Sequence, residues 1–250
     1  MNFCENGVTG HRGNPQDFPQ NTLVSFESAI SLGCDWVETD IRLTGDGHVV
    51  LSHDGDTRSE ADKFCVIGET PLGELRRLNM AAGFNMSHTE RTPLFASMPT
   101  LEEALELFRS QDKVRLSLQP KVPGALEAAE KIIRQMKFPE EMLGFNDGNL
   151  QYMIAARRAF PGAEIFYDRL KCDELENDIK TAREHRFENL VYNERFLNFE
   201  AVIKVLEAGL TPGVWTVCNP GEMDRFIAMN VKRFYTDFPA ELLKKLDVER

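Results

Sequence analysis

The sequence predicts an α/β fold in which strand–helix units form a parallel sheet. Short apolar runs alternate with helical patterns along nearly the whole chain, which is typical of such units. A length of 250 residues suits one α/β barrel or two small domains. No linker or low-complexity segment divides the chain, so we expect a single domain spanning residues 1–250.

Nine short apolar runs are the predicted strands. They are Gly7–Gly13, Trp36–Leu43, Val49–His53, Val114–Lys121, Met142–Phe145, Ala163–Tyr167, Asn189–Tyr192, Val214–Cys218 and Arg233–Asp237. A barrel of eight strands would use eight of these nine runs, so one strand is extra. Gly45-Asp46-Gly47 is too short to join parallel neighbours and indicates a hairpin turn. We therefore expect Val49–His53 to be the antiparallel or extra strand.

Helices are predicted between these strands, and two of them carry clear end signals. Asn21 or Thr22 can cap a helix that stops at Gly33, and Thr100 with Glu103 forms a capping box before the next apolar face. The remaining predicted helices are Ala125–Met136, Leu150–Phe160, Leu175–His185, Phe199–Ala208 and Glu222–Met229.

Residues 55–98 interrupt this alternation. The segment is polar and irregular apart from a short predicted helix around Leu72–Leu78, and it is too long for an ordinary connection. We interpret it as a small insertion near the functional site. The alternative is a solvated excursion without a role.

Composition excludes several function classes. The formal net charge of −11 and the pI near 5.0 argue against a nucleic-acid-binding or anionic-membrane-binding surface. Five scattered cysteines without metal-finger spacing indicate free thiols in a reducing compartment. No signal-peptide core and no apolar run of about 20 residues is present. We expect a cytoplasmic protein without membrane insertion, and the oligomeric state stays open.

Glu38 and Asp40 stand two residues apart on a predicted strand, so their side chains leave the same face. Carboxylate oxygens suit Mg²⁺ or Ca²⁺ better than zinc. The alternative is the alternation of an exposed strand, but apolar Trp36, Val37 and Ile41 surround the pair. The spacing favours a site for one divalent metal ion.

The hairpin geometry decides whether His53 joins these carboxylates. A two-residue turn at Asp46-Gly47 places His53 opposite Asp40, and one at Gly45-Asp46 places it opposite Glu38; directly paired residues share a face. A three-residue loop would send His53 to the other face. We expect one of the two-residue turns.

Further polar residues end other predicted strands, where the catalytic side chains of α/β barrels gather. His11 and Arg12 end the first strand; two histidines can act as acid and base, and an arginine fork suits a phosphate. Lys121 ends another predicted strand, and the side chain of Gln119 lies on the same face of that strand. Asp237 is an acidic residue at the end of the last predicted strand and could line the same mouth of the barrel.

In order, His11-Arg12-Gly13, Pro19-Gln20-Asn21-Thr22, Glu38-Thr39-Asp40, Thr44-Gly45-Asp46-Gly47 and His53-Asp54 resemble the glycerophosphodiester phosphodiesterase family. The resemblance continues through Pro99 to Glu103, Leu116 to Lys121, Trp215-Thr216-Val217 and Thr236 to Pro239. It therefore spans essentially the whole chain.

The resemblance implies a TIM (β/α)8 barrel and metal-dependent hydrolysis of a glycerophosphodiester to glycerol 3-phosphate and an alcohol, with a role in lipid and glycerol metabolism. By position, His11 and His53 would be the acid–base pair, and Arg12 and Lys121 would stabilise phosphate charge. Glu38, Asp40 and Gln119 would bind one Mg²⁺ or Ca²⁺ ion. Arg12, Lys121 and Trp215 would bind the small-molecule substrate.

Two positions depart from the family pattern, which usually has Glu where Gln20 and Gln119 stand. A Gln oxygen still coordinates a hard cation, but the site loses a negative charge. We expect weaker metal binding, a shifted substrate preference or a lost activity. The alternatives are a phosphodiesterase for a sugar phosphodiester, a non-catalytic phosphodiester-binding relative, and a lyase that releases a cyclic phosphate.

Overall fold

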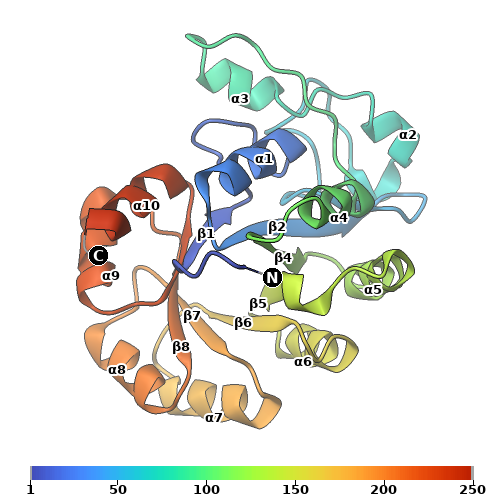
Figure 1. Cartoon of the computed structure of the whole chain (residues 1–250). Helices are drawn as coiled ribbons and strands as arrows, with labels where there is room; N and C mark the ends of the chain where they lie inside the picture. The colour runs from blue at the N-terminus through green and yellow to red at the C-terminus, as the bar shows by residue number, and fades with distance from the viewer. Residues whose placement is uncertain (1, 249–250) are drawn as a thin grey trace.

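The computed structural model describes residues 2–248 as a closed barrel of eight parallel strands with helices packed outside it (Figure 1). Around the barrel, β1 pairs with β9 on one side and with β2 on the other, which closes the sheet. The expected TIM barrel is confirmed. Its strands are β1 (Val8–His11), β2 (Trp36–Leu43), β4 (Arg115–Pro120), β5 (Leu143–Asp147), β6 (Glu164–Arg169), β7 (Asn189–Asn193), β8 (Thr211–Trp215) and β9 (Arg233–Thr236).

The ninth strand, β3 (Val49–Leu51), pairs antiparallel with the end of β2, as predicted for the extra strand. The turn between them differs from both predicted forms. Leu43 faces Val49, and the Thr44 amide donates to the His48 carbonyl at 2.9 Å, so the loop has three residues. Gly47 takes a φ of 84°, the left-handed position that such loops require. The two-residue turns are therefore wrong.

One strand is misplaced in the prediction. Strand β8 begins at Thr211 and ends at Trp215, whereas the prediction ran from Val214 to Cys218. Pro212 and Gly213 indicate a turn by composition, but both lie in the barrel wall. A side chain at Gly213 would meet Val191 at 2.9 Å, so crowding inside the barrel requires this glycine.

The helices follow the predicted caps. Thr22 accepts from the Ser25 amide at the start of α1, which Gly33 ends in the left-handed conformation, and Thr100 forms its capping box with Glu103. The C-terminal helix was not predicted, although Pro239 two residues after the predicted strand was a usable signal, because proline suits the first turn of a helix. The barrel helices are α1 (Leu23–Leu32), α4 (Leu101–Arg109), α5 (Ala125–Met136), α6 (Leu150–Ala159), α7 (Leu175–His185), α8 (Phe199–Glu207), α9 (Pro220–Ala228) and α10 (Pro239–Val248).

The barrel interior is layered. At the amino end of the strands, the buried Asp35 carboxylate pairs with Arg115 and Arg233. Above it, Trp36 and Phe166 pack edge to face with their ring centroids 5.1 Å apart. A side chain at Gly144 would meet both rings at 2.8 Å, so this glycine makes room for them. The aromatic layer forms the floor beneath the carboxyl ends of the strands.

The insertion between β3 and α4 folds around a small core of its own, at the top of Figure 1. It holds α2 (Leu72–Leu75), shorter than the predicted helix, and α3 (Ala82–Ser87), which was not predicted. Its core residues are Val50, Cys65, Ile67, Leu75, Leu78, Met80 and Met98. The segment is therefore a packed element and not an unstructured loop.

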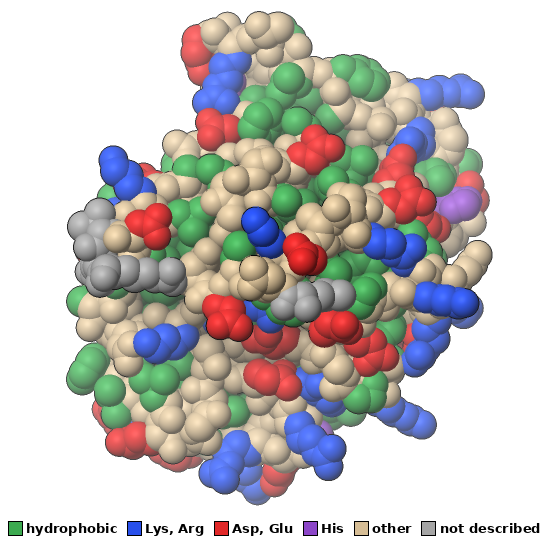
Figure 2. Space-filling model, in the orientation of Figure 1, with side chains coloured by type: hydrophobic (Ala, Val, Ile, Leu, Met, Phe, Trp, Pro, Cys, Tyr) green, Lys and Arg blue, Asp and Glu red, His purple; other side chains and the backbone are tan. Residues whose placement is uncertain are grey.

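Three further observations concern the surface charge, the cysteines and the length of the helices. Figure 2 shows acidic and basic side chains intermixed over the face turned to the viewer. All five cysteines are free thiols, as predicted. Within residues 2–248, none of the helices has both the length and the apolar character needed to cross a bilayer.

Candidate active site

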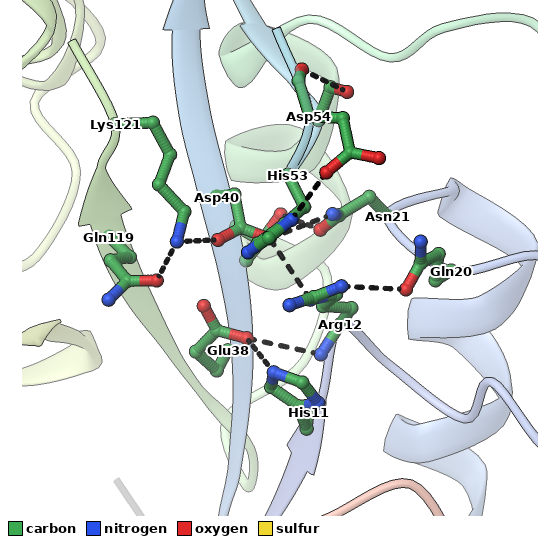
Figure 3. Close-up of polar contacts among 12 residues, drawn as sticks. His11, Arg12, Gln20, Asn21, Glu38, Asp40, His53, Asp54, Gln119 and Lys121 are labelled. Atoms are coloured by element: carbon green, nitrogen blue, oxygen red, sulfur yellow. Dashed lines mark hydrogen bonds and ion pairs between the residues drawn. The ribbon is translucent and has the colours of Figure 1, made fainter. Parts of the chain in front are cut away.

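A cleft of about 430 Å³ opens at the carboxyl ends of the barrel strands. It brings together most of the predicted site residues from five strands and their following loops. The cleft is lined by His11, Arg12, Glu38, His53, Gln119, Lys121 and Trp215. In Figure 3, Asp40 lies between Lys121 and Arg12 and pairs with both. Leu170 and Tyr235 add apolar and aromatic surface to the same cleft.

Arg12 follows β1 in a left-handed conformation, with φ of 60°. Such a φ costs a non-glycine residue roughly 1–2 kcal/mol, so surrounding contacts must hold it. The Arg12 amide donates to Glu38 Oε2 at 3.2 Å, and its guanidinium pairs with Asp40 at 3.2 Å and donates to Gln20 Oε1 at 3.0 Å. The strained turn thus places the guanidinium at the cleft wall.

Asp40 is fully buried and serves as the common partner of two cations. Its Oδ1 lies 3.0 Å from Lys121 Nζ and its Oδ2 lies 3.2 Å from Arg12 Nε, while Asn21 donates to Oδ2 at 2.9 Å. Burial by itself would raise the pKa of this carboxyl, but Arg12, Lys121 and the Asn21 hydrogen bond outweigh it and lower the pKa. Asp40 is therefore ionised and fixes both cations.

Gln119 connects Lys121 to a further carboxylate. Its Oε1 accepts from Lys121 Nζ at 2.5 Å, and its Nε2 donates to Asp147 Oδ2 at 3.3 Å. Lys121 Nζ consequently lies between Asp40 and Gln119 (Figure 3). The amide oxygen of Gln119 thus faces the Lys121 ammonium group, as a carboxylate oxygen of a glutamate at this position would.

Each histidine of the cleft has a carboxylate on Nδ1. His11 Nδ1 lies 2.7 Å from Asp237 Oδ1, and His53 Nδ1 lies 2.8 Å from Asp54 Oδ1. A carboxylate at Nδ1 favours the tautomer that carries its proton there and leaves Nε2 free as a base. Asp237, which the sequence predicted at the same mouth, is placed beside the cleft by its contact with His11.

His53 reaches the cleft by a route that strand parity excludes. The observed register puts His53 on the face opposite to Glu38 and Asp40 if the strand were to continue. Strand β3 instead ends at Leu51, and Arg42 Nε donates to the His53 carbonyl at 2.9 Å, which fixes a bend there. Burial, with Arg12 nearby, lowers the pKa of His53 and favours its neutral form.

Comparison with known proteins agrees with this geometry. The sequence profile of the Glycerophosphoryl diester phosphodiesterase family matches residues 11–241, which includes every residue of the cleft. The chain belongs to this family. Its members in the comparisons include the glycerophosphodiester phosphodiesterase of Caldanaerobacter subterraneus, 26% identical, with 94% of this chain and 96% of the relative covered. That of Bacillus subtilis is 22% identical, with 93% and 83% covered.

Solved structures share the fold of this family member. A phosphodiesterase from Oleispira antarctica, determined in complex with the product sn-glycerol-3-phosphate, aligns with a TM-score of 0.84 at 24% identity over 96% of both chains. A glycerophosphodiester phosphodiesterase from Thermotoga maritima aligns with a TM-score of 0.73 at 26% identity over 96% of this chain and 97% of the other.

The donor atoms of this family member fit a hard divalent cation. Among the described residues, Glu38 Oε1 is buried without a hydrogen-bond partner, and Glu38 lines the cleft; Asp40 Oδ1 is likewise buried, with Lys121 Nζ 3.0 Å away. Burial, with Asp40 beside it, raises the pKa of Glu38 to about 7, which a bound cation would lower. Within residues 2–248, no three His, Cys, Asp or Glu side chains form a metal-binding group.

Four carboxylates of this site were missed in the sequence. Asp54 belongs to the family-like motif but received no predicted role, although its position beside His53 was a usable signal. Asp147 is the last residue of β5 and Asp168 the last but one of β6, and their positions near strand ends could have indicated them. Glu60 lies in the insertion, and only the folded structure brings it to Gln20 at 2.5 Å.

Proposed function

We propose that this chain is a metal-dependent phosphodiesterase that hydrolyses glycerophosphodiesters to glycerol 3-phosphate and an alcohol. One observation carries the proposal: two histidines with carboxylates on Nδ1 share a cleft with two cations held by one buried carboxylate. The names of the relatives from Caldanaerobacter subterraneus and Bacillus subtilis support the same substrate class.

The residues of the cleft divide into two tasks. Arg12 and Lys121 neutralise the phosphate oxygens, where negative charge increases during phosphoryl transfer. One histidine accepts the proton of the attacking oxygen, from water or from a hydroxyl of the substrate, and the other gives a proton to the leaving alcohol. His53 suits the first task because its lowered pKa keeps it neutral. His11, whose Nδ1 lies 2.7 Å from Asp237 Oδ1, then serves as the acid.

A Mg²⁺ or Ca²⁺ ion would be held by Glu38, Asp40 and the side-chain oxygen of Gln119. When bound, such an ion would neutralise charge on the phosphate oxygens. Trp215 and Leu170 line the cleft beside the cations and offer apolar contact to the substrate. The five free thiols agree with a cytoplasmic location, which we propose on that ground.

The test is hydrolysis of a panel of glycerophosphodiesters with Mg²⁺ or Ca²⁺, followed by phosphorus NMR. Glycerol 3-phosphate and free alcohol are the expected products. A cyclic phosphate as the final product would identify a lyase. Activity confined to sugar phosphodiesters would show that these, and not glycerophosphodiesters, are the substrate class. No turnover of any phosphodiester, together with tight metal-free binding by calorimetry, would instead indicate a binding protein.

Gln119→Glu is expected to raise the affinity for Mg²⁺ or Ca²⁺ by about tenfold, because it adds a negative ligand. The new carboxylate would also face Asp147, so part of the gain is offset by repulsion between like charges. Adding Asp147→Asn removes that repulsion and should increase the gain. Titration calorimetry measures both variants, and an affinity unchanged from the wild type in both would exclude Gln119 as a ligand.

A further inference from the structure

Two consecutive residues of the insertion contact the network around the catalytic groups. Ser59 Oγ donates to Asp54 Oδ2 at 3.0 Å, and Asp54 holds His53. The next residue, Glu60, accepts at Oε1 from Gln20 Nε2 at 2.5 Å, and Gln20 accepts at its own Oε1 from Arg12 at 3.0 Å. Figure 3 shows Gln20 directed at the Arg12 guanidinium. The insertion thereby contacts Asp54 and Gln20, the two residues that hold His53 and Arg12.

We infer that Glu60 is a positioning residue for the phosphate-binding Arg12 and acts on it through the Gln20 amide. The inference deepens the proposed function and rests on it, because it takes Arg12 as the group that binds the substrate phosphate.

The polarity of the amide supports a directed chain of contacts. An amide has one acceptor end and one donor end, so Gln20 can satisfy a cation and a carboxylate together in only one orientation. Its oxygen faces the guanidinium and its nitrogen faces Glu60. Reversal would place a donor against the Arg12 donors and an oxygen against the carboxylate. Glu60 therefore selects the orientation in which Gln20 accepts from Arg12.

Glu60 is itself held firmly by the insertion. Only 7% of the residue is exposed. Its amide donates to the Thr57 carbonyl at 3.3 Å, and its own carbonyl accepts from the Gly83 amide at 2.9 Å, which ties it to α3. A buried carboxylate is costly unless it is paired, so its placement against Gln20 needs a compensating role.

Asp54, Arg12 and Asp40 are the charged groups that act on Glu60. Burial raises the pKa of Glu60 to about 7, against the lowering effect of the Gln20 hydrogen bond and of Arg12. Its carboxylate is consequently ionised at pH 8, where the test is made.

The same order of cation, amide and carboxylate recurs on the other side of Asp40, from Lys121 through Gln119 to Asp147.

The first test is Glu60→Gln, measured at pH 8 by calorimetry with glycerol 3-phosphate and with inorganic phosphate. The variant keeps the size of the side chain but lets the Gln20 amide rotate, so we expect the affinity for either probe to fall about tenfold. The melting temperature should stay equal or rise, because an ionised buried carboxylate has been removed. A residue with a purely structural role would instead lower the melting temperature and leave the affinity of the folded protein unchanged.

Glu69→Gln is the matched control, since Glu69 is an exposed glutamate of the same insertion. It should change neither phosphate affinity nor melting temperature. An affinity in Glu60→Gln equal to that of this control would overturn the inference.

The second test exchanges the two side chains. Gln20→Glu combined with Glu60→Gln restores one carboxylate beside Arg12 and lets the new amide donate to it. We expect phosphate affinity within about threefold of the wild type. An affinity as low as that of Glu60→Gln alone would show that an acceptor fixed beside Arg12 does not set the phosphate affinity, and would refute the inference.

A third measurement separates this inference from the proposed function. The nitrogen–proton NMR signal of Arg12 Nε reports the order of the guanidinium without substrate or turnover. We expect a sharp signal in the wild type and in the exchanged variant, and a broadened one in Glu60→Gln. An unchanged signal would overturn the role of Glu60, whereas failure to hydrolyse any phosphodiester would overturn only the proposed function.

Discussion

His53→Ala and His11→Ala are each expected to lower the kcat of phosphodiester hydrolysis by about 10²-fold or more, the usual contribution of an acid or base group. Both rings line the cleft with Nδ1 held by a carboxylate, Asp54 for His53 and Asp237 for His11. Removal of either ring leaves Arg12 and Lys121 in place. KM should therefore change much less than kcat, which steady-state kinetics separates.

The pH dependence distinguishes the two histidines. Burial and the nearby Arg12 lower the pKa of His53, so the wild-type rate should fall only below the ordinary histidine range as His53 becomes protonated. This acidic limb should disappear from the residual activity of His53→Ala and persist in His11→Ala. His48→Ala is the control, because His48 lies outside the cleft beside the hairpin turn and should keep wild-type kinetics. A near-wild-type kcat in either cleft variant would remove that histidine from the mechanism.

Asp35→Ala is expected to lower the free energy of unfolding by about 3 kcal/mol or more, the usual cost of breaking a buried ion pair on one side. The Asp35 carboxylate is fully buried at the amino end of the barrel and pairs with both Arg115 and Arg233. Without it, among residues 2–248, the two largely buried guanidinium groups share Glu164 as their remaining carboxylate partner. Glu164 moderates the loss but cannot neutralise both cations.

Urea denaturation measures this loss of stability. Glu130→Ala is the control, because its pair with Arg134 lies on the exposed side of α5 and should be worth about 0.5 kcal/mol or less. Asp35 lies at the end of the barrel away from the cleft, so the folded variant should retain the wild-type kcat. A loss of stability no larger than that of Glu130→Ala would show that Arg115 and Arg233 are sufficiently neutralised without Asp35.

Much of the barrel was predictable because its signals are local. Strand parity placed Glu38 and Asp40 on one face, and both side chains are buried there. The cap at Thr22 and the capping box at Thr100 depend on residues within three positions of each other, and both formed as predicted. Strand β8 was misplaced because Pro212 and Gly213 suit a turn locally, whereas crowding by Val191 requires a glycine at position 213 of the barrel wall.

The sequence by itself therefore determined the α/β barrel, its extra antiparallel strand, and a set of histidines, cations and carboxylates at strand ends. The tertiary structure alone decided how these groups are partnered. His11 meets Asp237, 226 residues away, because barrel closure places β1 beside β9. Glu60 meets Gln20 because the insertion folds back over the first strand–helix loop. Periodicity reports the face that a side chain occupies, but the contact between two distant side chains depends on how the whole chain packs.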